Sequence, residues 1–154
     1  MKSIFRLTGM FILLFSSSLL LAQENADYFF SRQVDYDFDK TIELTRASLK
    51  DQGFGIITEI EMDKTLKEKL DNVKMGRYTI LGACNPKFAY QTLQIEENIG
   101  LFLPCKVLIK EVKKNKTEVV MVNPSVLMKM LGNEELEGIA DEVTVRFKTA
   151  LQNL

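Results

Sequence analysis

The segment RYTILGACNPKFAYQTLQIEEN, residues 77–98, predicts a β-strand that leads directly into an α-helix. Residues 77–84 are typical of a strand. Asn85 is a favourable N-cap, because its side chain can accept a hydrogen bond from a free N–H group of the first helical turn. Pro86 suits the first helical position, where no N–H donor is needed. The Asn-Pro dipeptide is therefore explained by local structure, as the start of a helix over 86–98.

The remaining elements follow from apolar periodicity and from cap and turn residues. Strands are predicted over 27–38, 54–62, 99–112 and 117–123, the last two joined by the turn KKNK at 113–116. Helices are predicted over 39–53, 64–72, 125–131 and 133–154. The helix over 125–131 follows a second Asn-Pro, and the helix over 133–154 keeps an apolar stripe that includes Phe147 through about five turns.

Two of the strands predict a continuous apolar face. In strand 99–112 this face consists of Ile99, Leu101, Leu103, Cys105, Val107 and Ile109. In strand 54–62 it consists of Phe54, Ile56, Ile60 and Met62, with Glu59 and Glu61 on the other side. Alternation also places Tyr78, Ile80, Gly82 and Cys84 on one face of strand 77–84, which predicts that both cysteines point towards the helices.

The order of elements predicts an α+β domain with two layers, in which helices cover one face of a sheet. The predicted order is β-α-β(4)-α with helical insertions between the later strands. The long last helix is expected to lie across the sheet and to close the core.

The first 22 residues have the pattern of a secretory signal peptide. Lys2 and Arg6 are followed by the uncharged run GMFILLFSSSLLLA (9–22), which is shorter than the about 20 residues that span a bilayer. Cleavage is expected after Ala22, and an uncleaved N-terminal anchor is the alternative. We therefore expect an exported protein, periplasmic or secreted, with one domain over 23–154 and no membrane span after signal removal.

Charge argues against a nucleic-acid partner. The chain has 20 basic and 21 acidic residues, so the loss of Lys2 and Arg6 with the signal leaves 18 basic residues and a net charge near −3. No basic block with interleaved aromatic residues is present, which is the usual signature of nucleic-acid binding.

The chain contains no histidine. A Ser-His-Asp or Cys-His catalytic site within one chain is therefore excluded. A zinc site would depend on two cysteines and carboxylates, a poor set of zinc ligands. The eight glycines are scattered and form no phosphate-binding loop. These absences favour a binding module over an enzyme, and they indicate no particular cofactor.

Three blocks of the chain resemble a known family. GFGIITEIEMDKTLKEKL, YTILGACNPKFAYQTLQIEENIGLFLPCKVLI and the closing helix are similar to the domain-of-unknown-function family 302, over about residues 28 to 152. The resemblance implies a fold similar to the TATA-binding-protein-like class and a homodimer, with no established activity. The matched motif positions are Gly82, Cys84, Asn85, Pro86, Gly100, Pro104 and Cys105. The export signal sets this chain apart from the many relatives that lack one.

Cys84 and Cys105 are the only cysteines, and three interpretations of them remain open. They are two buried thiols that pack as small apolar residues, a structural disulfide formed in an oxidising compartment, or a functional pair that exchanges electrons or holds a soft metal. The third is supported by the helix start at Asn85, since the positive end of a helix dipole favours a thiolate at Cys84. Cys and Met ligands suit Cu(I), and five methionines of the mature chain are candidates: Met62, Met75, Met121, Met128 and Met130.

Two classes of function therefore compete. The first is a non-catalytic exported module that binds a small ligand or a protein and is expected to be homodimeric through a sheet edge or face. The second is a thiol-dependent redox or soft-metal protein centred on Cys84 and Cys105. The absence of a Cys-x-x-C motif argues against ordinary thioredoxin-type exchange.

Overall fold

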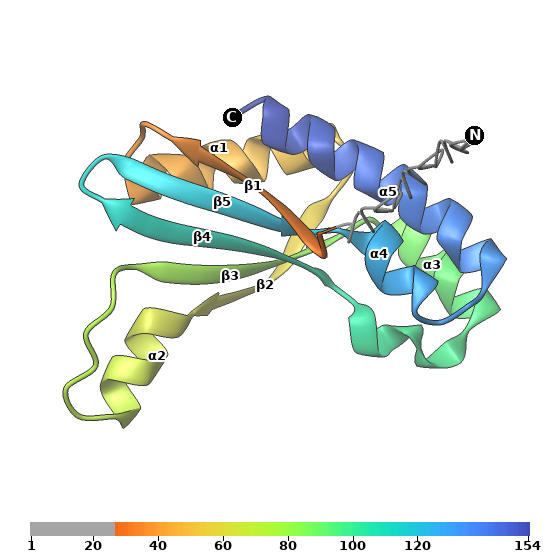
Figure 1. Ribbon diagram of the computed structural model, residues 1–154, viewed down its shortest axis with the longest axis horizontal. Helices are drawn as coiled ribbons and strands as arrows, with labels where there is room; N and C mark the ends of the chain where they lie inside the picture. The colour runs from red at the N-terminus through yellow and green to blue at the C-terminus, as the bar shows by residue number, and fades with distance from the viewer. Residues whose placement is uncertain (1–26) are drawn as a thin grey trace, which may run out of the picture.

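The computed structural model describes residues 27–154, which form one five-stranded sheet with helices (Figure 1). The strands are β1 (Phe29–Val34), β2 (Gly55–Glu61), β3 (Tyr78–Cys84), β4 (Cys105–Lys113) and β5 (Lys116–Val122). The helices are α1 (Phe38–Asp51), α2 (Met62–Lys69), α3 (Pro86–Ile95), the 3-10 helix η1 (Glu97–Phe102), α4 (Pro124–Lys129) and α5 (Glu134–Gln152). The predicted signal peptide over 1–22 lies outside the described residues.

The sheet has the strand order β1-β5-β4-β3-β2, and every neighbouring pair is antiparallel. β1 and β2 are adjacent in the chain yet form the two edges of the sheet, because α1 carries the chain from one edge to the other. β3, β4 and β5 follow one another in space as they do in sequence, which places β4 at the centre. The predicted α+β fold and its β-α-β(4)-α order are confirmed.

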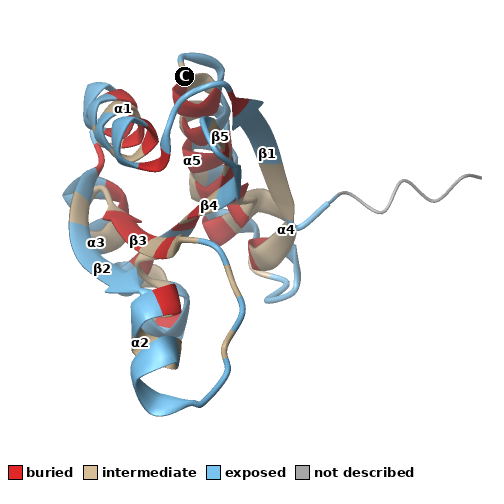
Figure 2. Ribbon diagram, turned by 90° about the vertical axis from the view of Figure 1, so that its left-hand side faces the viewer, coloured by how far each residue is buried: buried red, intermediate tan, exposed pale blue. Residues whose placement is uncertain are grey.

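One face of the sheet packs against α1 and α5 and forms the main core (Figure 1). The strands contribute alternating residues to this core, among them Leu81 and Ala83 of β3 and Val107 and Ile109 of β4, all fully buried. Figure 2 shows buried positions along α1 and α5, whereas Asp63 is the one buried residue of α2. Among residues 27–154, no helix combines the length and the apolar character that crossing a membrane requires.

Two helix starts agree with the asparagine caps read from the sequence, whereas α2 starts at Met62, before the predicted helix over 64–72. Asn85 accepts hydrogen bonds from the N–H groups of Lys87 and Phe88, at 3.0 and 3.3 Å, and so caps α3. Asn133 caps α5 in the same way through the N–H of Glu135, at 3.0 Å. In each case a short polar side chain satisfies donors that the first helical turn leaves free.

The strand predicted over 99–112 is wrong in its first half. Residues 97–102 form η1, and the strand begins only at Cys105. The Glu96 carboxylate accepts a hydrogen bond from the N–H of Asn98 and so starts the 3-10 turn. Ile99 and Leu103 are four residues apart and turn inward in the helical geometry, while Leu101 is 86 % exposed. The alternating apolar residues therefore fitted a strand and a helical turn equally well.

The predicted apolar face of the second strand is also wrong. A β-bulge between Ile56 and Thr58 shifts the register of β2 against β3. Ile56 lies opposite Ala83 and packs against the core, whereas Ile60 lies opposite Ile80 on the other face and is exposed. The extra residue of a bulge reverses the alternation beyond it, so Glu59 reaches the helix side and pairs with Arg46 of α1.

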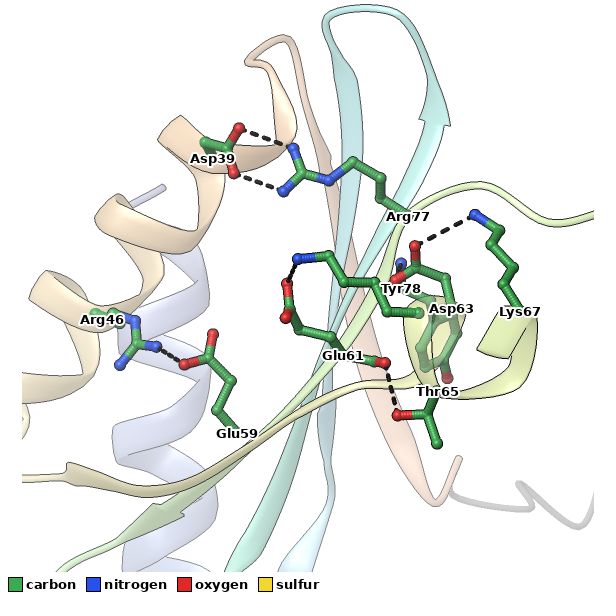
Figure 3. A network of polar contacts seen from close by, with 10 residues as sticks. Asp39, Arg46, Glu59, Glu61, Asp63, Thr65, Lys67, Arg77 and Tyr78 are labelled. Carbon is green, nitrogen blue, oxygen red and sulfur yellow. Dashed lines mark hydrogen bonds and ion pairs between the residues drawn. The ribbon is translucent and has the colours of Figure 1, made fainter. Parts of the chain in front are cut away.

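Polar contacts join the start of β3 to both α1 and α2 (Figure 3). Arg77 makes a two-bond ion pair with Asp39 of α1, at 2.7 and 2.8 Å, and its guanidinium lies over the ring of Phe38. The buried carboxylate of Asp63 accepts hydrogen bonds from the N–H of Tyr78, at 3.1 Å, and from Lys67, at 3.4 Å. Of these contacts, the hydrogen bond from the N–H of Tyr78 to Asp63 is the one that joins α2 to the sheet.

Candidate functional site

The two sequence motifs that contain the cysteines meet at one end of the sheet. Cys105 begins β4 and lies directly opposite Ala83, the neighbour of Cys84 on β3. Cys84 in turn lies opposite Gly55, the first residue of β2. The antiparallel register therefore brings the end of LGACNP, the start of β4 after LPC and the GFG segment to the same place.

The helix-covered face of β3 differs from the one predicted. Leu81 and Ala83 face the core together with Thr79, so the expected set of Tyr78, Ile80 and Gly82 belongs to the opposite face. Cys84 falls on that opposite face by alternation. As the last residue of β3, however, it still borders the space beyond the strand end.

The turn at Asn85 is supported from the end of α1. Gly53 has φ of +84°, a left-handed conformation that glycine adopts without strain, and its N–H donates to the carbonyl of Lys50 to end α1. A Cβ atom at Gly53 would lie 3.0 Å from Nδ2 of Asn85. Gly53 of the GFG segment is therefore in close contact with the side chain of Asn85 in the CNP segment.

An apolar cavity of about 60 Å³ opens at this end of the sheet, on the helix side. Its floor includes Ala83, Cys84 and Cys105, and residues of α3, η1, α4 and the first half of α5 line the rest of it. The helices α3, α4 and α5 lie together on the right-hand side of Figure 1. The other lining residues are Phe54, Asn85, Phe88, Ala89, Thr92, Ile99, Phe102, Leu103, Pro124, Met128, Leu136, Ile139, Ala140 and Val143. No Asp, Glu, Lys or Arg is among these residues.

Both cysteines are free and half-buried, so the structure does not show the disulfide that the sequence left open. Burial raises the pKa of the Cys84 thiol above its usual value. Burial and the neighbouring Cys84 raise the pKa of Cys105 to about 11, against a smaller opposing effect of Lys106. The expectation that the start of α3 would favour a Cys84 thiolate was therefore wrong. Asn85 already occupies the N–H groups of Lys87 and Phe88, which leaves fewer donors for a thiolate.

Within residues 27–154, no cluster of three or more Cys, Asp or Glu side chains could hold a metal ion. Of the five methionines considered, Met128 of α4 lines the cavity together with both cysteines. Met121 is fully buried in the main core, and Met130 is 78 % exposed.

The remaining motif positions lie around the cavity and do not line it. Pro86 occupies the first turn of α3. The ring of Pro104 packs on the face of β3 opposite the helices and occupies the space above Gly82. Gly100 lies in η1, and an added Cβ would meet nothing within 4 Å. Neither Gly82 nor Gly100 lines the cavity, so the motif contributes Cys84, Asn85 and Cys105 to it directly.

Comparison with known proteins places the chain in a family. The model of the family "Domain of unknown function DUF302" matches residues 30–154. The chain belongs to the DUF302 family. A solved relative, described as "Crystal structure of uncharacterized conserved protein DUF302 from Bacillus stearothermophilus", is 30% identical and superposes with a TM-score of 0.76. The match covers 83% of this chain and 98% of that one. No curated protein matches, and the DUF302 description assigns no activity.

Sequence reasoning missed one side of this DUF302 cavity. The wall opposite the sheet comes from α5, through Leu136, Ile139, Ala140 and Val143. These residues form the apolar stripe of the last helix, which predicts burial but not the partner against which they pack. No local signal distinguishes a helix residue that lines a cavity from one that fills a core.

Proposed function

We propose that this DUF302 chain is an exported, non-catalytic module that binds a small ligand in the cavity between β3, β4 and the surrounding helices. The observation that carries the proposal is the lining itself, since 17 residues from six elements and the adjoining loops surround an apolar space. Small-ligand sites are commonly apolar clefts with a few placed polar groups. The export of the chain rests on the sequence of residues 1–22.

The polar groups of the cavity favour binding over catalysis. Oδ1 of Asn85 caps α3, and the hydroxyl of Thr92 donates within α3 to the carbonyls of Phe88 and Ala89. The two thiols remain, and both have raised pKa values. With no charged side chain in the lining, the cavity has no general acid or base poised near neutral pH.

The size of the cavity limits the ligand. A volume of about 60 Å³ is well below the roughly 150 Å³ that accommodates benzene in an apolar protein cavity. It suits a ligand of a few non-hydrogen atoms, or the end of a larger one that enters past Phe102, a lining residue that is 38 % exposed.

Xenon is a suitable probe because it is apolar and monatomic. We expect ¹²⁹Xe NMR of the protein over residues 23–154 to show a shifted, saturable signal, and amide shifts to change around Ala83, Ala89 and Ala140. Ala140→Val and Ala89→Leu add side-chain volume to the lining and should reduce the effect, whereas Ala47→Leu on the exposed side of α1 should not. An absence of saturable binding in the unmodified protein, or equal binding by all three variants, would contradict the proposal.

We also propose that the protein is a homodimer through the face of the sheet opposite α1 and α5. On this face Leu108 lines a shallow hollow together with Tyr28 and Phe29, beside the ion pair of Lys110 and Glu118 at 2.7 Å. A surface with apolar residues and both charges can pair with a second copy of itself. Light scattering should give twice the chain mass, and Leu108→Glu should give monomers while Val145→Glu on exposed α5 should not. A monomeric unmodified protein would overturn this assignment.

A further inference from the structure

We propose that the chain binds a medium-chain fatty acid, with the end of the hydrocarbon tail in the apolar cavity and the carboxylate beside Lys106. The inference rests on the proposed function, because it names the class of ligand that this same cavity holds. It is carried by a hollow of about 200 Å³ that borders the cavity at the start of β4, and Lys106 is the one charged residue in the lining of this hollow.

The hollow and the cavity are direct neighbours. Four residues line both of them, namely Phe102, Cys105, Pro124 and Met128. The hollow is completed by Leu101, Pro104, Lys106, Val122 and Leu127. Its volume exceeds the roughly 150 Å³ that accommodates benzene in an apolar protein cavity. It can therefore hold the part of a hydrocarbon chain for which the cavity of about 60 Å³ has no room.

Phe102 lies where these spaces meet. It lines the cavity, the hollow and a third hollow beside Leu131. Phe102 is 38 % exposed and belongs to neither of the two buried apolar clusters. Exposed side chains change rotamer rapidly, so the ring can turn aside without disturbing the core. A chain that lies in the hollow can then continue into the cavity.

Lys106 supplies the positive charge that a fatty acid requires. Its ammonium group donates to the carbonyl of Pro104, another lining residue of the hollow, at 2.9 Å. An ammonium group has three N–H donors, so two remain for a carboxylate. None of the ion pairs within residues 27–154 includes Lys106. Lys110 on the same strand, in contrast, already pairs with Glu118.

The charges around these spaces select a ligand with one anionic head and one apolar tail. The third hollow has Glu96 in its lining, which repels an anion, so the head group is favoured only at Lys106. A lipid with two acyl chains needs a second apolar space that leads away from the same head group. A neutral hydrocarbon gains nothing from Lys106. A single-chain fatty acid uses both the apolar lining and the cation.

Calorimetric titration of the protein over residues 23–154 with saturated fatty acids, below their micelle concentrations, tests the tail. Each methylene moved from water into apolar surroundings strengthens binding about fourfold. We expect the affinity to rise by this factor per methylene from butanoate to octanoate and then to level off, because the space is filled. No binding of octanoate, or an affinity that still rises from decanoate to dodecanoate, would overturn the inference.

The charged head is tested by comparing octanoate with octan-1-ol, which has the same tail and no charge. Lys106→Gln should weaken octanoate binding about tenfold, the usual effect of losing a hydrogen bond to a charged group, and should leave octan-1-ol binding unchanged. Lys50→Gln removes the same charge from an exposed position of α1 and should alter neither affinity. Unchanged octanoate binding by Lys106→Gln, or an equal loss for both ligands, would overturn the placement of the head group.

Two methionines give a readout that needs no variant. Met128 lines both the cavity and the hollow, whereas Met130 is 78 % exposed and lines neither. The methyl resonance of Met128 should therefore shift saturably with octanoate, and that of Met130 should not. A shift of Met130 alone would place the ligand elsewhere and overturn the site.

Ala140 separates the tail in the cavity from a tail that stays in the hollow, because it lines the cavity only. Ala140→Val should end the rise in affinity at a shorter chain and keep the effect of Lys106, and an unchanged chain-length profile would overturn the inference. The xenon experiment distinguishes the two levels of the argument. If xenon enters the cavity and octanoate does not bind, only the fatty-acid site fails. If neither binds, the cavity is not a ligand site and the proposed function fails as well.

Discussion

The ring of Pro104 fills the space above Gly82, so that the proline of one motif packs directly on the glycine of the other. A Cβ atom added to Gly82 would lie 2.5 Å from Cγ of Pro104 and 2.1 Å from Oγ1 of Thr58. Both distances are far shorter than a normal contact between these atoms. The small residue at Gly82 is therefore required by its neighbours on β2 and before β4.

We expect Gly82→Ala to lower the free energy of unfolding by about 1–3 kcal/mol, the usual cost of an overpacked site. Thr58 can rotate away, but the ring of Pro104 cannot, so the strand itself has to move. Urea unfolding measures the change. Gly138→Ala is the control, because an added Cβ there meets nothing within 4 Å and replacing a glycine within α5 should raise stability by about 0.5–1 kcal/mol. Equal effects of the two substitutions would mean that Pro104 does not restrict Gly82.

Phe147 joins the last helix to the GFG segment. It is fully buried, and its ring meets that of Phe54 edge to face, with 4.8 Å between the centroids. Phe147→Ala should lower the free energy of unfolding by about 3–5 kcal/mol, because it leaves a cavity between α5 and the sheet. Val145→Ala, at a 63 % exposed position of the same helix, should change it by less than about 0.5 kcal/mol. A loss below roughly 1 kcal/mol for Phe147→Ala would show that this ring does not anchor α5.

The sequence predicted most elements because their signals are local. Asn85, Asn133 and Gly53 mark helix ends through contacts within a few residues, and the structure places N-caps at both asparagines and Gly53 directly after the C-cap of α1. The apolar stripe that contains Phe147 likewise predicts a buried helix face from spacing alone. Such features could be read without knowing what lies across the core.

The errors arose where the same residues fit two geometries or where distant contacts decide. The apolar residues over 99–103 suit a strand by alternation and η1 by their spacing of four, and only the packing of Ile99 against α5 selects the second. The bulge at Ile56 and Thr58 has no marker in the sequence. The helix field expected at Cys84 was offset by burial, which depends on α3, α4 and α5 together.

Asp63 should make the protein sensitive to acid. Burial tends to raise the pKa of this carboxyl, but the hydrogen bonds from Tyr78 and Lys67 outweigh it, so the pKa lies below its usual value. A depressed pKa stabilises the fold above the unfolded pKa, near 4, and the stabilisation is lost as the pH falls through the folded value. Unfolding free energies measured from pH 6 to pH 3 should therefore fall less steeply for Asp63→Asn than for the unmodified protein. Asp141→Asn, at an exposed position of α5, is the control, and a slope unchanged by Asp63→Asn would refute the role.

Export should remove the first 22 residues. Lys2, Arg6 and the apolar run up to Ala22 have the composition that signal peptidases and the export machinery recognise. Mass spectrometry of protein recovered from the periplasm or medium of a Gram-negative host should find Gln23 at the N-terminus. Leu14→Arg, which places a charge within the apolar run, should keep the chain inside the cell. Recovery of exported protein that still begins at Met1 would contradict cleavage.

The two thiols should differ in reactivity, with Cys84 the faster. Burial raises the pKa of both thiols, and because Cys105 is the more deeply buried, burial together with a smaller contribution from Cys84 brings its pKa to about 11. At pH 8 such a thiol is ionised in only about one molecule in a thousand, and the thiolate is the form that reacts. Iodoacetamide should therefore modify the folded, reduced Cys105→Ser variant, which keeps Cys84, faster than the Cys84→Ser variant at every pH from 7 to 9. Both rates should still rise at pH 9, because neither thiol has then finished ionising.

The rates should become equal in denaturant, which removes the burial and provides the control. Equal rates in the folded variants would show that the surroundings of the two thiols do not distinguish their reactivity. The segment LGACNP would then have a structural role only.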